Sequence, residues 1–295
     1  MSFNSYDIVF LIFVNLLNKI IFDMRLFILK LSILIALPFS LFNPSIDTQE
    51  FQGKAYYFSK SRMDLGTWGS RMSEAQKKQI QSRLKGRLEK TYILSFNKEE
   101  SLFKEEEKVD AISGATDSWG SNFARGEQYK NINTTSLVQT QEFYGKRFLV
   151  KDELQKIEWK MDSESKQIGQ YICFKATATV PSEELNWFNF SWNDLAEENA
   201  EGENAEIKMA EIEAWYTLQI PLKHGPAEYW GLPGLILEVS AGNTTILCSE
   251  IVINPKEKIN IEAPDKGKEI NKVDYRATVQ GKMLEMRNNR GRRRG

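Results

Sequence analysis

The stretch IGQYICFKATATV at residues 168–180 decides the fold class, because its apolar and polar side chains alternate along the chain. Such alternation, rich in β-branched and aromatic residues, is typical of a β-strand with one buried face. On this pattern Ile172, Phe174 and Ala176 share one face, and Cys173 lies on the other. We expect an antiparallel strand whose first face is turned towards the core.

Similar segments lie on both sides of this strand, separated by turn-forming residues with no helical pattern between most of them. The succession predicts an antiparallel meander. We therefore expect a mainly β fold with accessory α, namely a single curled antiparallel sheet or half-barrel with one helix near each end of the domain. A Gly-, Ser- and Asn-rich stretch at 110–134 is predicted to be a long loop. The further strands are expected at 52–59, 91–96, 101–107, 136–141, 144–150, 156–161, 212–219, 234–240 and 244–253.

Two helices are predicted, one near each end of this β-rich region. The first covers about 73–89, where Ser73 and Gln76 form a capping box. Its apolar stripe consists of residues spaced four apart, which favours an amphipathic helix. The second covers 271–286 and has Asn271 as its N-cap. The stripe of the first helix is Ile80, Leu84 and Leu88.

The N-terminal region resembles a secretory leader. Two basic residues precede an apolar run at 31–42, which is shorter than the roughly 20 residues that span a bilayer. We interpret 24–49 as a signal peptide and 1–23 as a mis-called upstream extension. A membrane anchor running through 8–42 is the alternative.

Histidine and cysteine counts limit the chemistry. With one histidine and two cysteines, the chain holds neither a zinc site with several imidazoles nor a four-cysteine centre, so we expect no metal and no cofactor. An exported chain meets an oxidising compartment, where Cys173 and Cys248 are candidates for a disulfide. Two free, buried thiols are the alternative.

Charge is balanced overall, with 39 basic and 40 acidic residues, but it is segregated. An acidic insert at 194–213 carries eight acidic residues and one lysine, and a basic tail at 287–295 carries five arginines. We read the first as a solvated insert within a single domain, 50–286, and the second as a solvated tail that follows this domain. A near-neutral exported chain is not expected to bind nucleic acid, and no stable membrane span is expected after removal of the signal.

The segment between the strands at 212–219 and 234–240 contains the hexapeptide GLPGLI at 231–236. Together with the segments around it, this string resembles the GLPGLI family, a group of exported proteins, mainly from Bacteroidetes, whose function is unknown. The resemblance implies an envelope or secreted location and a β-rich fold, and it brings no catalytic residues. We expect its loop either to pin the chain to the sheet or to form a ligand rim. The residues of this signature loop are Trp215, Pro221, Gly225, Pro226, Tyr229, Trp230, Gly231, Leu232, Pro233 and Gly234.

No catalytic residue stands out. His224 and Glu228 are four apart but lack the second histidine of an HExxH site, and no G-x-S-x-G string marks a serine nucleophile. We expect His224 to lie in a surface loop.

The leading hypothesis is a non-catalytic binding, carrier or assembly-support protein of the periplasm or outer membrane, or a secreted one, with an apolar or peptide-like ligand. The alternatives are an envelope hydrolase with an unrecognised site and a structural partner of an outer-membrane complex. A carrier predicts an apolar cavity, a hydrolase predicts clustered ionisable residues with shifted pKa values, and a structural partner predicts an exposed apolar patch.

Overall fold

The computed structural model describes residues 14, 16–27, 51–62, 71–106, 125–188, 190 and 208–292. The chain divides into two compact units, Met1–Gln49 and Glu50–Gly295. In the first unit the described residues are helical and exposed. Among the described helices, none combines the length and the apolar character that crossing a bilayer requires. Most of the predicted signal peptide lies outside the described residues and stays a prediction.

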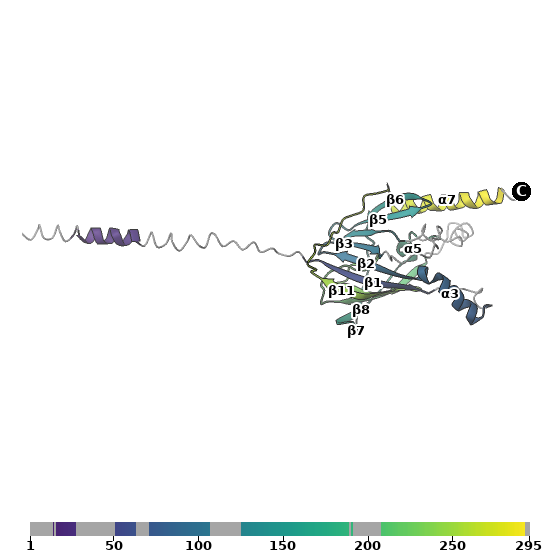
Figure 1. Ribbon diagram of the computed structural model, residues 1–295, viewed down its shortest axis with the longest axis horizontal. Coiled ribbons are helices and arrows are strands. Elements are labelled where there is room, and N and C mark those ends of the chain that lie inside the picture. The colour runs from purple at the N-terminus through teal and green to yellow at the C-terminus, as the bar shows by residue number, and fades with distance from the viewer. Residues whose placement is uncertain are drawn as a thin grey trace, which may run out of the picture. The chain divides into compact units, whose positions relative to one another are not determined.

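The described residues of the second unit form one sheet of twelve strands in the order β12-β6-β5-β4-β3-β2-β1-β11-β10-β9-β8-β7 (Figure 1). The two end strands, β12 and β7, do not pair with each other, so the sheet is open. Neighbouring described strands are antiparallel, apart from the parallel pair β12 and β6. The prediction of a mainly β fold with one open sheet is confirmed. The strands are β1 (Gly53–Ser61), β2 (Glu89–Phe96), β3 (Glu100–Glu105), β4 (Gln128–Asn131), β5 (Ser136–Phe143), β6 (Lys146–Glu153), β7 (Lys160–Ile168), β8 (Tyr171–Pro181), β9 (Met209–Thr217), β10 (Leu235–Ala241), β11 (Thr244–Ile253) and β12 (Lys268–Ile270).

Strand β1 lies in the middle of the sheet and joins its two halves. It pairs with β2 along one side and with β11 along the other. Just outside the paired residues, the backbone N–H of Gln52 donates to the Asn254 side chain 3.1 Å away, across a separation of 202 residues. The N-terminal and C-terminal parts of the unit are therefore held together by its first strand.

Several details of the predicted strands were wrong, and the strand expected at 156–161 begins only at Lys160 of β7. Residues 168–180 are not one strand, because β7 ends at Ile168 and β8 begins at Tyr171. Within β8, Ile172 is 57% exposed while Cys173 and Ala176 are buried, so the predicted assignment of faces is wrong at the start of this strand. Opposite this strand, β7 contains two extra residues between Met161 and Ser165, an irregularity that the local sequence pattern does not reveal.

Another wrong detail is the expected loop at 110–134, which contains strand β4 (Gln128–Asn131). Its residues 110–124 lie outside the described part of the chain. The acidic insert falls largely outside it too, although Met209–Glu213 belong to strand β9.

The helices begin where their caps predict. In α3 (Glu74–Leu88) both bonds of the Ser73–Gln76 capping box are formed, and before α7 (Lys272–Arg292) the side-chain oxygen of Asn271 accepts from the Asp274 backbone N–H at 2.7 Å. Helix α3 has no buried residue, although Ile80, Leu84 and Leu88 of its apolar stripe are partly buried. Figure 1 shows the reason, since α3 extends beyond the ends of the strands instead of crossing the sheet. Helix α7 continues into the predicted basic tail, and a short helix, α5 (Ser182–Leu185), follows β8.

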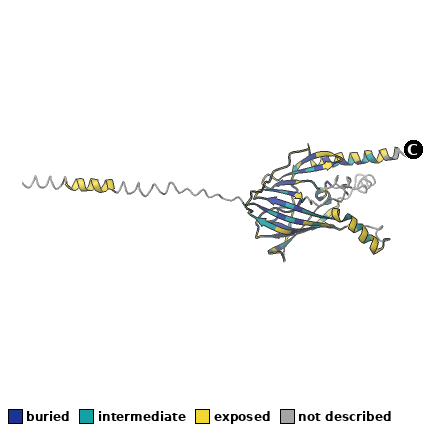
Figure 2. Ribbon diagram, viewed as in Figure 1, coloured by how far each residue is buried: buried dark blue, intermediate teal, exposed yellow. Residues whose placement is uncertain are grey.

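Two buried clusters form the core, and Figure 2 shows their residues as dark bands along the strands. The larger joins the central strands to β8, β9 and β10, and the smaller lies where Tyr275 of α7 meets Phe148 of β6 and Trp187. Both cysteines are buried and free, so the predicted disulfide is wrong. Cys173 on β8 and Cys248 on β11 have two strands between them. Adjacent strands are about 4.8 Å apart. The separation between β8 and β11 therefore exceeds the distance of about 7 Å within which the Cα atoms of a disulfide lie.

Candidate functional site

The signature loop connects β9 to β10 and folds back on the first residues of β10. The backbone N–H groups of Leu235 and Ile236 donate to the carbonyls of Ile220 (2.9 Å) and His224 (3.1 Å). Gly234 passes so close to β9 that a Cβ atom there would come within 2.0 Å of the Thr217 carbonyl oxygen. The glycine is needed because no side chain fits at this approach.

Aromatic residues fasten this loop to its surroundings. Trp215, Tyr229 and Leu232 are buried. The indole N–H of Trp230 donates to the Gln155 carbonyl at 2.7 Å, and the indole N–H of Trp159 donates to the Trp230 carbonyl at 2.8 Å. The loop is thus tied both to β9 and to the segment between β6 and β7.

The remaining signature residues define the shape of the loop. Gly231 has a φ of 95°, a left-handed conformation that favours glycine. Pro221 and Pro233 are exposed, whereas Gly225 and Pro226 are buried. The sequence therefore identified a real structural unit, whose outer surface carries Pro221, Pro233 and Gly231.

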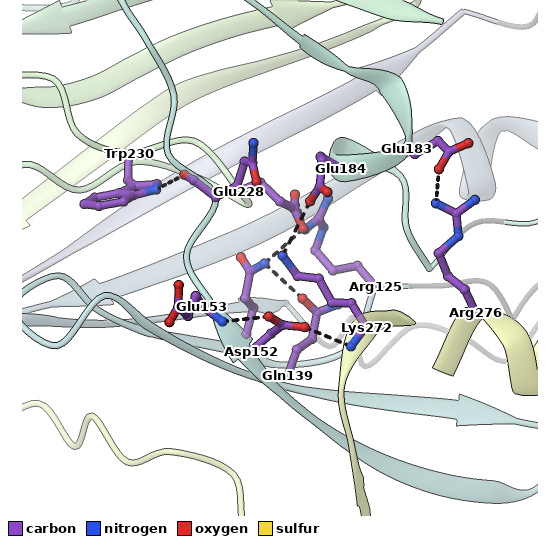
Figure 3. Close-up of polar contacts among 12 residues, drawn as sticks. Arg125, Gln139, Asp152, Glu153, Glu183, Glu184, Glu228, Trp230, Lys272 and Arg276 are labelled. Carbon is purple, nitrogen blue, oxygen red and sulfur yellow. Dashed lines mark hydrogen bonds and ion pairs between the residues drawn. The ribbon is translucent and has the colours of Figure 1, made fainter. Parts of the chain in front are cut away.

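Beneath the loop lies a buried ionic cluster, which we define as Arg125, Gln128, Lys130, Gln139 and Glu228. Glu228 is 6% exposed, and the Nη1 atom of Arg125 donates to both of its carboxylate oxygens at 2.6 Å (Figure 3). The amide of Gln128 donates to Glu228 at 3.0 Å and to Gln139 at 2.9 Å. The cluster connects strands β4 and β5 to the signature loop.

Lys130 holds the loop by its backbone. Its ammonium group donates to the carbonyls of Gly225 and Ala227, both at 2.7 Å, and more weakly to that of Tyr229 at 3.4 Å. Burial lowers the pKa of Lys130 to about 7, with Glu228 opposing and Arg125 adding to the change. The lysine therefore serves as a clamp on three carbonyl groups, with no room for access from solvent.

His224 is completely buried, so the expectation that it lies in a surface loop is wrong. Its Nε2 atom lies 3.1 Å from the Asn97 carbonyl oxygen, which identifies Nε2 as the protonated nitrogen. Burial, and then the charge of Lys130, lower its pKa to about 3. The neutral imidazole thus packs under the loop as a donor to the β2–β3 turn.

A cleft of about 830 Å³ opens beside the ionic cluster, at the ends of strands β2, β3, β5 and β6. We call it the charged cleft, because ionisable residues of both signs predominate on its walls. Arg125 belongs both to this cleft and to the ionic cluster. The ionisable residues of the walls are Glu89, Lys90, Lys104, Glu105, Glu106, Arg125, Glu127, Glu142, Arg147, Asp265 and Lys266.

Gln141 of β5 also borders the charged cleft, and its carboxamide stands out. The residue is 2% exposed, and neither its Oε1 nor its Nε2 has a hydrogen-bond partner within the described part of the chain. A buried carboxamide without partners is unusual, since the large majority of buried polar atoms in proteins are bonded.

Sequence reasoning missed these polar residues. Arg125 and Lys130 lie in the stretch that was predicted to be a loop. Gln139 and Gln141 could have been found, because they alternate in register with Leu137 and Phe143 and so share the buried face of β5. Among the described residues, no group of three or more His, Cys, Asp or Glu side chains is arranged to hold a metal ion.

Comparison with known proteins gives a family of unknown function. Residues 159–238, which run from just before β7 into β10, match the family model described as "Protein of unknown function (Porph_ging)". The matched segment contains the GLPGLI hexapeptide, and membership of the GLPGLI family itself remains a prediction. No curated protein matches the chain.

Among solved structures, those of PNGF-II in the C2 and P21 space groups are similar, each with a TM-score of 0.44 and 16% sequence identity. They cover 78% of this chain, which in turn spans about a third of theirs, 32% and 33%. A likeness at this TM-score supports no statement about the activity of this chain.

Proposed function

We propose that this chain is a non-catalytic binding protein of the cell envelope that holds a peptide-like ligand in the charged cleft. The proposal includes export directed by residues 24–49, and hence a periplasmic, outer-membrane-associated or secreted location. The observation that carries it is the cleft itself, whose volume of about 830 Å³ lies in the range of ligand sites.

The chemistry of the walls favours a peptide over a lipid. A site for an apolar ligand is lined mainly by apolar and aromatic side chains, whereas Lys90, Lys104 and Arg147 face this cleft together with Glu105 and Glu142. Walls that carry positive and negative charges complement a peptide that also carries charges of both signs. We therefore set aside the apolar ligand and keep the peptide-like one.

The buried ionisable groups support binding over hydrolysis. A general acid or base must come within hydrogen-bond distance of the substrate proton. Lys130 and His224 are fully buried, Glu228 is nearly so, and none of the three borders the charged cleft. Lys130 and Glu228 already hold the loop and Arg125 in hydrogen bonds. The hydrolase alternative would need them to leave these partners.

Peptide binding is tested with fluorescently labelled decapeptides of mixed Lys and Glu content, by anisotropy at low and high salt. We expect binding that weakens as salt screens the charges. Lys104→Glu, which reverses one charge of the wall, weakens binding several-fold. Lys258→Glu, at an exposed position outside the cleft, leaves it unchanged. If no peptide binds, or if both variants behave alike, the proposal is wrong.

Export is tested separately, by N-terminal sequencing of the protein recovered from the envelope and from the medium. A mature N-terminus between residues 40 and 50 is the expected result. An intact Met1 on a cytosolic protein would refute the export part of the proposal.

A further inference from the structure

The geometry points to Gln141 as the residue that recognises the peptide backbone in the charged cleft. We infer that its carboxamide pairs with the N–H and C=O of one ligand residue in extended conformation. This inference rests on the proposed function and adds to it the chemical group that is recognised and the residue that recognises it.

The position of Gln141 is fixed by the strand that carries it. Leu137, Gln139, Gln141 and Phe143 share the buried face of β5, so the backbone holds the Gln141 side chain inward, at the wall of the cleft. One carboxamide offers an acceptor and a donor side by side. Leaving such buried atoms unpaired is unfavourable, because they lose their bonds to water without gaining others. An occupant that supplies both a donor and an acceptor recovers this cost.

An extended peptide supplies this pair. In an antiparallel sheet, opposed residues exchange two bonds because the N–H and C=O of a single extended residue point to the same side. A glutamine carboxamide presents the complementary acceptor and donor. Gln141 would therefore act towards the ligand as a neighbouring strand does, beyond the last residue of β5 that pairs with β4.

The neighbouring charges favour a neutral amide over a carboxylate as the bound group. Arg125, the cation of the cluster that borders the cleft, has both of its 2.6 Å contacts with the Glu228 carboxylate. The charge of Arg125 is therefore already compensated, and an anionic group gains little from it. An uncharged backbone group needs no free cation and can pair with the carboxamide alone.

The test compares the parent protein with Gln141→Leu, using an N-terminally acetylated decapeptide of Lys, Glu and Ala that has no Asn or Gln. A peptide without side-chain amides restricts the effect to the backbone. We expect Gln141→Leu to bind about tenfold more weakly, the loss that corresponds to one net hydrogen-bonding interaction. Gln167→Leu, at an exposed glutamine on β7, is the matched control and leaves binding unchanged.

A series of peptides with single backbone N-methyl groups completes the experiment. One N-methylated position is expected to weaken binding to the parent about tenfold and to have no further effect on Gln141→Leu, because both changes remove the same contact. Urea unfolding of Gln141→Leu verifies that it is folded, and a leucine suits this position between Leu137 and Phe143. Equal peptide affinity of the parent and Gln141→Leu overturns the inference and leaves the proposed function standing. A parent that binds no peptide overturns both.

Discussion

Replacing Glu228 by glutamine tests the buried ionic cluster most directly. The substitution keeps the size of the side chain and removes the only negative charge that contacts Arg125 within the described part of the chain. The pair is well buried, with 13% of the Arg125 side chain and 4% of the Glu228 side chain exposed. Removing one partner of such a pair leaves an uncompensated charge in the protein interior.

The expected loss follows from this geometry. Breaking a buried ion pair costs about 3–5 kcal/mol, and the lower end applies here because the carboxamide introduced by Glu228→Gln can still accept one bond from Arg125. A loss of about 3 kcal/mol, with a urea m-value of about 2–3 kcal/mol/M, lowers the unfolding midpoint by about 1–1.5 M. The assay is urea unfolding at pH 7, followed by tryptophan fluorescence.

Two further variants separate the charge effect from other causes. Glu285→Gln removes the same group from an exposed pair with Lys282 on α7 and is expected to leave the midpoint unchanged. Arg125→Met combined with Glu228→Gln is expected to recover part of the loss, because the unpaired guanidinium is gone. A midpoint of Glu228→Gln equal to that of the parent would refute the reasoning.

Three other outcomes are expected. The pKa of Lys130 is lowered to about 7 from its ordinary 10.5, so between these values the unfolded chain binds one proton more than the folded chain. The free energy of unfolding should therefore rise by about 1.5 kcal/mol from pH 7 to pH 8.5 and fall again on acidification. Urea unfolding measures this rise, which Lys130→Met should lack. Burial raises the pKa values of Cys173 and Cys248 to about 11 and 12, so a thiol reagent at pH 8 should label neither cysteine in the native protein. After denaturation without reductant the reagent should label both. No labelling after denaturation would indicate a disulfide. Gly234→Ala should lower the free energy of unfolding by about 1–3 kcal/mol, and with it the thermal midpoint, because the new Cβ would come 2.0 Å from a β9 backbone oxygen. Gly86→Ala has open space around it and should leave the midpoint unchanged or raise it.

The sheet was predictable wherever a strand carries its own pattern. Strand β11 (Thr244–Ile253) has the predicted bounds, because a dense β-branched run is bounded by turn residues on both sides. Strands β4 and β12 were missed, since QYKN and KEI are short, polar and defined by their neighbours in the sheet. The order of the strands, with β1 between β2 and β11, depends on contacts between distant residues that no local pattern contains.

The site was predictable only in part. Glycines and prolines marked the signature loop, because shape depends on these residue types directly. The charged partners beneath it were not found, since Arg125 and Lys130 look like solvated residues until the loop carbonyls and Glu228 are placed against them. Gln141 was readable in principle, from its register with Phe143.

The central place of β1 has a consequence for the order of events during synthesis. The first strand of the sheet finds one of its two partners only when β11 has emerged, about 190 residues later. Such long-range pairing is slow, because a large loop must close before its contacts form. Until then both β1 and the incomplete C-terminal strands present unpaired backbone edges, which are templates for association with other chains. A nascent chain of this protein thus stays incompletely folded for most of its synthesis and depends on being kept apart from its neighbours until Ile253 is in place.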